Sequence, residues 1–264
     1  MIIKEKEIKA ALIDWLEAKG MVQDAVIINE MVVANWTRRA DIAIANGRLY
    51  GFEIKSEADS LKRLPGQIES FSNHFDKVTI VAASKFINQV KEEYPSEIGI
   101  LEAYRIQGTV KIKQVRAGKL IEIKDHASLG NLITKLELSR ILKSYSTPHT
   151  VTDAKNILIE KTKTMPTKVF KQYVLSCIKA RHINTHCAFY EARKKRGSLL
   201  SLGLLSKQEN MRRVAEKKEQ QLKKTFSTKN SFYERQLDIN LLERECGALP
   251  DFMPRTIKIK RKLK

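Results

Sequence analysis

The sequence contains little of what marks exported or membrane proteins. Its 264 residues include three cysteines, Cys177, Cys187 and Cys246, an odd number whose spacing shows no disulfide framework. No apolar run approaches the roughly 20 residues that a membrane span needs. The N-terminal segment carries Glu5 and Glu7 in place of the apolar core of an export signal. These absences together predict a protein of the reducing cytoplasm.

Motifs of several enzyme classes are also missing. The sequence has no glycine-rich loop that could cradle phosphates and no serine-nucleophile motif, so neither ATP use nor serine-hydrolase chemistry is indicated. His182 and His186 could share a helical face, with Cys177 and Cys187 nearby. Because a second pair of ligands is missing, a zinc site is disfavoured. We interpret these residues as ordinary parts of a helix.

Acidic residues are scarce in one half of the chain only. Residues 1–124 contain 19 Lys and Arg against 17 Asp and Glu, a net charge of +2, whereas residues 125–264 contain 30 against 13, a net charge of +17. So basic a region attracts polyanions, because each neutralised phosphate releases counterions. The alternative is a basic surface that is merely solvated, and no basic amphipathic helix with an aromatic face indicates a membrane. The asymmetry favours nucleic acid as the partner.

Hydrophobic spacing predicts an alternation of helices and strands in the first half of the chain. The expected helices cover 5–18, 61–75 and 86–94, and the expected strands cover 25–34, 39–45, 49–55, 78–82, 98–104 and 110–115. This order predicts an α/β fold, a mixed sheet flanked by helices. After residue 125 the expected elements are helices at 128–143, 152–162, 167–195, 206–225 and 232–246, with a mobile basic tail at 258–264. We therefore predict an α/β domain at 1–124 and a basic helical region at 125–264 that binds nucleic acid or a partner.

Three charged residues interrupt two strands that otherwise have the composition of a core. Asp41 lies in one strand, and Glu53 and Lys55 lie in the next. Charges in such strands are costly unless they are paired or bound to a metal, and two neighbouring carboxylates repel unless a cation lies between them. Mg²⁺ suits such oxygen ligands and can activate water for attack on a phosphate. The alternative is a surface hairpin with a cross-strand ion pair.

This interpretation makes a demand on the turn between the two strands. A plain two-residue turn at Asn46-Gly47 would direct Asp41 and Glu53 to opposite faces of the sheet. A shared site requires both on one face, so we predict a pairing offset of one residue. The expected device is a three-residue loop at 45–47 with its glycine in the left-handed conformation, or a bulge at Gly51.

The spacing of Asp41, eleven residues and then Glu53-Ile54-Lys55 resembles the PD-(D/E)XK nuclease superfamily. The run from Gly51 through Arg63-Leu64-Pro65-Gly66-Gln67 to Asp76-Lys77-Val78-Thr79 is similar to a little-characterised bacterial family of predicted nucleases within it. The likeness covers residues 5–104 and is fainter as far as Arg181. Ala40 stands where the superfamily name has proline.

The resemblance implies a restriction-endonuclease-like fold and a Mg²⁺-dependent DNA endonuclease in which Mn²⁺ can substitute. Asp41, Glu53 and the carbonyl of Ile54 would bind the metal, and Lys55 would act at the attacking water. Gln67 matches a helical Gln-x-x-x-Tyr signature that supports the site.

Two features of the implied site stay open. Phe71 replaces the tyrosine of that signature, so its hydroxyl is lost and we expect Phe71 only to pack. A further acid would complete or tune the site, and two candidates compete. One lies in the first helix, at Glu5 or Glu7, with Glu7 preferred because Ala11 follows one turn later on the same face; the other is Glu30, in a strand.

The sequence thus predicts a nuclease that hydrolyses phosphodiester bonds in DNA, within phage defence or a mobile element. Two alternatives remain, a nucleic-acid-binding protein without catalysis on a nuclease-like scaffold, and a subunit that depends on a partner. A homodimer or a partner would use the C-terminal half. The complete set of Asp41, Glu53 and Lys55 weighs against a site that has lost its chemistry.

Overall fold

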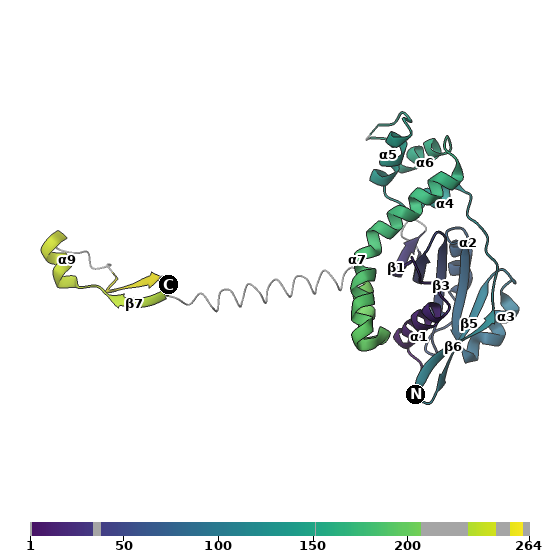
Figure 1. Ribbon diagram of the computed structural model, residues 1–264, viewed down its shortest axis with the longest axis horizontal. Coiled ribbons are helices and arrows are strands. Elements are labelled where there is room, and N and C mark those ends of the chain that lie inside the picture. Colours follow the sequence, from purple (N-terminus) through teal and green to yellow (C-terminus); the bar gives the residue numbers. More distant parts are fainter. Residues whose placement is uncertain (1, 34–37, 151, 207–231, 247–253, 261–264) are drawn as a thin grey trace. The chain divides into compact units, whose positions relative to one another are not determined.

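The computed structural model describes residues 2–33, 38–150, 152–206, 232–246 and 254–260 (Figure 1). The chain divides into two compact units, Met1–Asn210 and Met211–Lys264. The first unit is a mixed α/β structure with a six-stranded mixed sheet flanked by helices, as the hydrophobic spacing predicts. None of the described helices is long and apolar enough to cross a membrane.

The sheet keeps its strands in the order of the sequence. They are β1 (Val26–Val33), β2 (Arg38–Ala45), β3 (Leu49–Lys55), β4 (Lys77–Ala83), β5 (Gly99–Ile106) and β6 (Thr109–Arg116). The pairs β1–β2, β2–β3 and β5–β6 are antiparallel, whereas β3, β4 and β5 run parallel. Parallel neighbours need crossovers, and these carry the helices α2 (Leu64–Ser72) and α3 (Ile87–Glu93). The short apolar run predicted as a buried strand is β4, the fourth strand of six.

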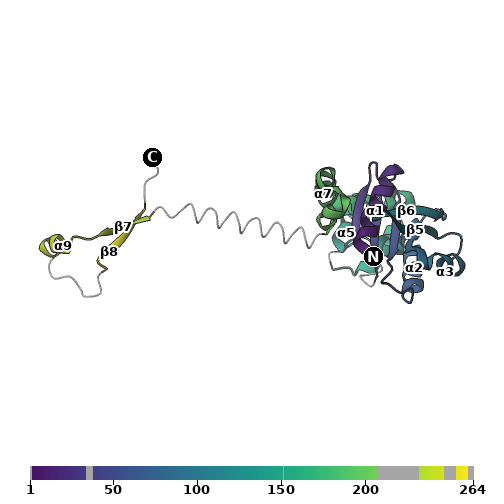
Figure 2. The ribbon, with the colours of Figure 1, turned by 90° about the horizontal axis from the view of Figure 1, so that it is seen from below.

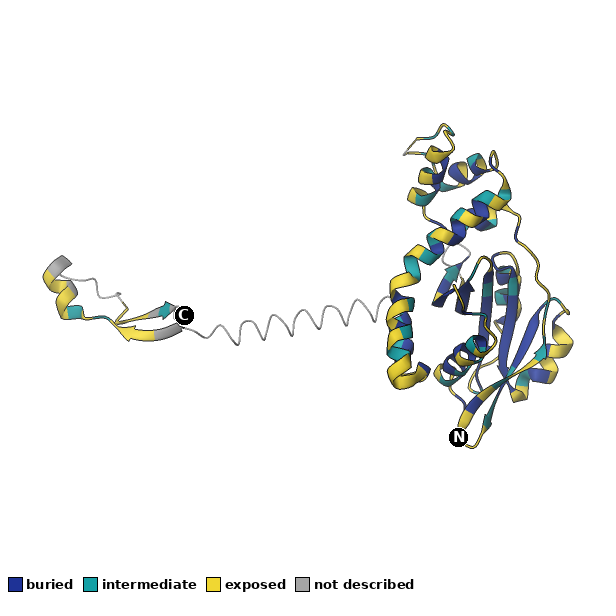
Figure 3. Ribbon diagram, viewed as in Figure 1, coloured by how far each residue is buried: buried dark blue, intermediate teal, exposed yellow. Residues whose placement is uncertain are grey.

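Two apolar cores cover the two faces of this sheet. Helix α1 (Glu5–Ala18) buries Ile8 and Leu12 in the same core as Ile42 and Phe52 of the sheet. The other core contains α2 together with α4 (His126–Asn131), α5 (Lys135–Ser144) and α6 (Lys155–Thr162). Figure 3 shows most of β2, β3 and β4 as buried between these layers, whereas β6 is largely exposed. The strands therefore hold any polar residue at a high cost unless it faces an opening.

The long helix α7 (Thr167–Ser201) joins both layers. It lies at the β1 end of the sheet, while α3 lies towards the opposite end (Figure 1 and Figure 2). Phe170 belongs to the core under α2, whereas Phe189 belongs to the core under α1. Near its end the helix is interrupted at Gly197, whose φ of 80° is outside the helical region, and the short 3₁₀ turn η2 (Leu202–Leu205) follows.

The predicted domain boundary at residues 124 and 125 is not where the compact units divide. Ile123, Leu138 and Phe170 lie in the same core as Ile28 and Ile80 of the sheet. The amphipathic helices of the second half need an apolar surface to cover, and the sheet face beside α2 supplies it. The helices α4 to α7 therefore belong to the same compact unit as the sheet, and this unit ends at Asn210.

Two local predictions after residue 125 also change. The helix expected at 128–143 is two helices, α4 and α5, because Thr134 and Glu137 form a capping box that starts a new helix.

The helix expected at 232–246 and the mobile tail expected at 258–264 are wrong in part. Strand β7 (Phe232–Gln236) pairs antiparallel with β8 (Thr256–Lys260), and α9 (Ile239–Cys246) lies between them in the chain. The alternation of Thr256 to Lys260 has the period of a strand, which the basic composition hides. Of the helix expected at 206–225, all but residue 206 lies outside the described residues, as does 261–264.

Candidate active site

The turn between β2 and β3 decides whether the predicted acids can meet. The two strands pair Ala45 with Leu49 and Ile42 with Phe52, so the next position places Asp41 opposite Glu53. Directly opposed residues of antiparallel strands lie on one face. The predicted offset of one residue is confirmed, with Gly47 at a φ of +94°. The loop itself is Asn46–Arg48, one residue later than predicted, and the Asn46 side chain donates to the Met21 carbonyl at 3.0 Å.

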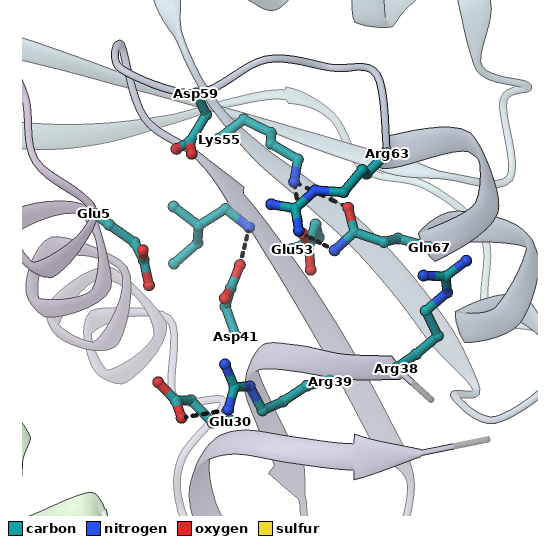
Figure 4. Close-up of a pocket in the computed structure, with 11 residues that line it drawn as sticks. Glu5, Glu30, Arg38, Arg39, Asp41, Glu53, Lys55, Asp59, Arg63 and Gln67 are labelled. Carbon is teal, nitrogen blue, oxygen red and sulfur yellow. Dashed lines mark hydrogen bonds and ion pairs between the residues drawn. The ribbon is translucent and has the colours of Figure 1, made fainter. Parts of the chain in front are cut away.

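Asp41 and Glu53 open into a polar cleft of about 320 Å³. Figure 4 shows the cleft between α1, the strand ends of β1 to β3, and α2. Its lining consists almost wholly of charged and amide side chains: Glu5, Glu30, Arg38, Arg39, Asp41, Glu53, Ile54, Lys55, Asp59, Arg63 and Gln67. The structure thus brings together Asp41, Glu53, Ile54, Lys55, Gln67 and Glu30 of the predicted site.

Glu53, Lys55 and Gln67 form a closed set of hydrogen bonds on the floor of the cleft. The Lys55 ammonium donates to Glu53 Oε1 at 2.8 Å and to Gln67 Oε1 at 3.0 Å, and Gln67 Nε2 donates to Glu53 Oε1 at 2.5 Å. Glu53 and Lys55 are only 2% and 5% exposed. Helix α2 holds Gln67 in place because Phe71, one turn later, is fully buried against Phe75. Phe71 packs, as the loss of the tyrosine hydroxyl predicts.

The two carboxylates lie in an environment that disfavours negative charge. Burial and the charge of Asp41 raise the pKa of Glu53 to about 7, and burial also raises the pKa of Asp41. Asp41 Oδ2 accepts a hydrogen bond from the Ile54 N–H at 2.7 Å. Glu53 Oε2 is buried with no hydrogen-bond partner. A buried carboxylate oxygen without a donor is a site that a cation would satisfy.

The ligand chemistry of this cleft fits magnesium better than zinc. Within the described residues, no group of three or more His, Cys, Asp or Glu side chains is close enough to hold a metal. Mg²⁺ does not need such a group, since it keeps several waters and takes one or two carboxylates together with substrate phosphate. Asp41, Glu53 and the Ile54 carbonyl therefore fit Mg²⁺, and Mn²⁺ prefers similar oxygen ligands.

Of the three candidates for a further acid, Glu5 and Glu30 line the cleft and Glu7 does not. Glu7 accepts from the Lys4 N–H at 2.9 Å and pairs with Arg105 of β5 at 2.9 Å. Glu7 does not line the cleft, so the prediction that its side of α1 turns towards the site is wrong: that side contacts Arg105 of β5. Glu5 lines the cleft instead, with its carboxylate 2.8 Å from the Lys9 ammonium.

Glu30 occupies an unusual position beside Asp41. Strands β1 and β2 pair Asn29 with Ile42 and Met31 with Ala40, so Glu30 is opposite Asp41. Its φ of 56° is in the left-handed region, which costs a residue with a side chain about 1 kcal/mol or more. Three acids, Glu30, Asp41 and Glu53, thus follow one another across three adjacent strands. The Glu30 carboxylate is 3.2 Å from Arg39 and 3.9 Å from Lys9.

Sequence reasoning did not single out two other residues of the cleft. Asp59 accepts from the Ser56 N–H at 2.8 Å and from the Ser56 hydroxyl at 2.6 Å, which fixes the loop after β3. Arg63 directly precedes α2 and lines the cleft. Its position two residues before Pro65, at the start of the predicted helix, was a signal in the sequence, but only the folded chain shows that Arg63 reaches the cleft.

Comparisons with known proteins place this chain in one family. The family model of bacteriophage P4 protein cII matches residues 2–206. Protein cII of Enterobacteria phage P4 is 36% identical over 259 residues, which cover 97% of each chain. A solved structure of a protein of unknown function from Silicibacter pomeroyi aligns with 57% of this chain and 99% of its own, at 18% identity and a TM-score of 0.37. A likeness of that size carries no argument. The family match spans most of the chain and the phage relative nearly all of it, so this protein belongs to the family of bacteriophage P4 protein cII.

Proposed function

We propose that this protein is a Mg²⁺-dependent nuclease that hydrolyses phosphodiester bonds in DNA, on a restriction-endonuclease-like sheet. One observation carries the proposal. Asp41 and Glu53, from adjacent strands, converge with Lys55 in one polar cleft although their burial raises both carboxylate pKa values. Two buried carboxylates with raised pKa values destabilise the fold, and such groups are typical of sites that bind a charged ligand. The +19 net charge supports a polyanionic substrate.

The side chains divide the work of hydrolysis among them. Asp41, Glu53 and the Ile54 carbonyl would hold the metal, which when bound polarises the phosphate and lowers the pKa of water. The Lys55 ammonium, fixed by Glu53 and Gln67, is placed to orient the attacking water and to offset the negative charge of the phosphate oxygens in the transition state. Gln67 uses both ends of its amide to keep Glu53 and Lys55 at hydrogen-bond distance.

The family relationship suggests the biological context of this activity. The curated relative is a phage protein, so we propose a cytoplasmic nuclease of a phage or related mobile element. The basic helical part of the first unit would hold DNA through phosphate contacts, which position a substrate without reading its sequence.

Cleavage by the purified protein tests the proposal. With Mg²⁺ or Mn²⁺, we expect the wild type to cut at least one of linear, circular, single-stranded and branched DNA or RNA. Asp41→Asn and Lys55→Ala should lower the rate by at least about a hundredfold while DNA binding survives, because each removes a group that acts on the reacting atoms. Chelation by EDTA should abolish cutting.

The matched control is Glu69→Gln, which changes an exposed carboxylate on α2, two residues from Gln67. This variant should cut as the wild type does. A wild-type protein that binds but never cuts would support the binding protein without catalysis. Equal cutting by the wild type, Asp41→Asn and Lys55→Ala would show that the activity comes from a contaminant or from another site.

A further inference from the structure

The charges that line the cleft do not all find partners within it. Arg39 pairs with Glu30 at 3.2 Å, and Lys55 pairs with Glu53 at 2.8 Å. Arg38 and Arg63 line the same cleft, are exposed, and make no ion pair or side-chain hydrogen bond with any described residue. Two guanidinium groups are thus left available to a ligand.

These two arginines come from different elements to the same wall. Arg38 begins β2, and Arg63 is the residue before α2. Gly66 in the first turn of α2 leaves room for Arg38, since a Cβ there would lie 3.2 Å from Arg38 Nη2. Figure 4 shows Arg38 and Arg63 flanking Gln67. The α2 side of the cleft is therefore basic.

On the opposite wall, Lys9 and Arg39 are paired with acids and are not left for a ligand. Glu5 comes from α1 and Glu30 from β1, and both line the cleft on the far side of Asp41 (Figure 4). Because the cations there are already paired with Glu5 and Glu30, a polyanion is attracted more strongly to the α2 wall, which Lys55 adjoins. The charge pattern thus favours binding of a nucleic-acid strand along the α2 side of the cleft.

We propose that Arg38 and Arg63 bind backbone phosphates of the nucleic-acid strand next to the bond that is cut. A guanidinium carries a fixed fork of N–H donors that matches two phosphate oxygens, and it stays charged at every relevant pH. Two such groups on one wall fit neighbouring phosphodiesters of a single strand. The inference rests on the proposed nuclease function for its placement beside the scissile bond, but the phosphate site can be tested without cleavage.

The test measures how salt weakens DNA binding by the full-length protein in EDTA. The probe is a fluorescein-labelled single-stranded oligodeoxynucleotide, and its anisotropy gives the affinity over a series of salt concentrations. Each phosphate contact on a single strand contributes about 0.7 to the slope of log affinity against log salt. We expect Arg38→Met and Arg63→Met each to lower the slope by about that amount, and the double variant to lower it by the sum.

Arg48→Met is the matched control, because Arg48 is an exposed arginine in the β2–β3 loop, at the other end of these strands from the cleft. It loses the same charge and should keep the wild-type slope. Equal slopes for the wild type and the double variant, or an equal decrease in the control, would overturn the proposal. Oligonucleotides with a 5′-phosphate and with a 5′-hydroxyl should bind alike; a strong preference for the phosphorylated end that depends on both arginines would show a terminal phosphate site instead.

The outcome is separable from that of the nuclease proposal. A slope that falls in the variants while the wild type never cuts DNA supports the phosphate site and contradicts the nuclease. A wild type that cuts DNA and variants that keep its slope support the nuclease and contradict the phosphate site. Thermal melting of each variant confirms that a changed slope does not come from unfolding.

Discussion

Glu53 is buried in an environment that destabilises its negative charge. Its side chain is 2% exposed, Asp41 lies opposite on the neighbouring strand, and one of its two oxygens has no hydrogen-bond donor. The Lys55 ammonium at 2.8 Å offsets this only in part, since the pKa of Glu53 is still raised to about 7. In the metal-free protein, the folded state is therefore less stable when Glu53 is ionised than when it is protonated.

The pH dependence of metal-free stability follows from that shift. Between the ordinary pKa of 4.5 and the raised value of about 7, the folded protein binds a proton that the unfolded chain releases. The contribution of Glu53 to stability is therefore full below 4.5 and is lost as pH rises towards 7. Glu53→Gln should remove this loss and, above pH 7, raise the free energy of unfolding by about 1 kcal/mol.

Thermal melting in EDTA across this pH range measures the effect. The control Glu69→Gln should melt with the pH dependence of the wild type. A Glu53→Gln protein that is less stable than the wild type above pH 7 would contradict the prediction. It would show that the ion pair with Lys55 outweighs the repulsion from Asp41.

Helix α7 is the element that ties the basic helices to the sheet. Its Lys171 is buried and lies 2.6 Å from Asp76, in the segment that leads from α2 into β4. Asp76 also accepts from the N–H groups of Leu49 and Ile123, at 2.8 Å and 3.0 Å. One carboxylate thus joins the start of β3, the start of β4, the chain before α4 and α7. The position of β3, and with it Glu53 and Lys55, depends on this junction.

Lys171→Met should destabilise the protein by about 3–5 kcal/mol, because it leaves the Asp76 charge buried and unpaired. Urea unfolding at neutral pH measures the change. Lys168→Met, an exposed lysine of the same helix, should change stability by less than about 0.5 kcal/mol. A second substitution, Asp76→Asn, should recover part of the loss in the Lys171→Met background. A loss that the second substitution does not reduce would assign the effect to packing instead of charge.

At the scale of the whole molecule, the basic helices up to residue 205 pack on the sheet and do not form a region of their own. Helices α4 to α7 share one core with the sheet, and η2 near residue 205 belongs to the core under α1. The first compact unit ends at Asn210, close to residue 206 where the family match ends. The α/β sheet and the basic helices therefore form one folding unit.

A chain of residues 1–206 should fold by itself, whereas residues 1–124 should not. The shorter chain exposes Ile28, Ile80 and other core residues that α4 to α7 cover, and it leaves Asp76 without Lys171. Circular dichroism and a cooperative melting transition distinguish the two. The full-length chain is the control, and its transition should resemble that of residues 1–206. Cooperative melting of residues 1–124 would restore the predicted boundary at residue 124.

Much of the fold and of the site follows from local patterns in the sequence. Alternation along β2 and β3 assigns residues to faces, and the Asn46-Gly47 turn identifies the hairpin. The demand that two acids share a face then predicts the offset that the strands show. Gln67 could be named through the resemblance, because it matches the helical Gln-x-x-x-Tyr signature of the superfamily. Such predictions succeed because the residues involved are neighbours in the chain or across one hairpin.

The sequence by itself determined the strands and helices of the first half, the hairpin that carries Asp41, Glu53 and Lys55, and the basic character of the rest. Only the tertiary structure decided that Glu5 and Glu30 line the cleft while Glu7 faces β5, that Arg38 and Arg63 share one wall, and that the basic helices complete the core of the sheet. The physical reason is the range of the interactions. Backbone pairing and side-chain period act over a few residues, whereas the packing of α1, α2 and α7 on the sheet depends on surfaces that distant segments build together.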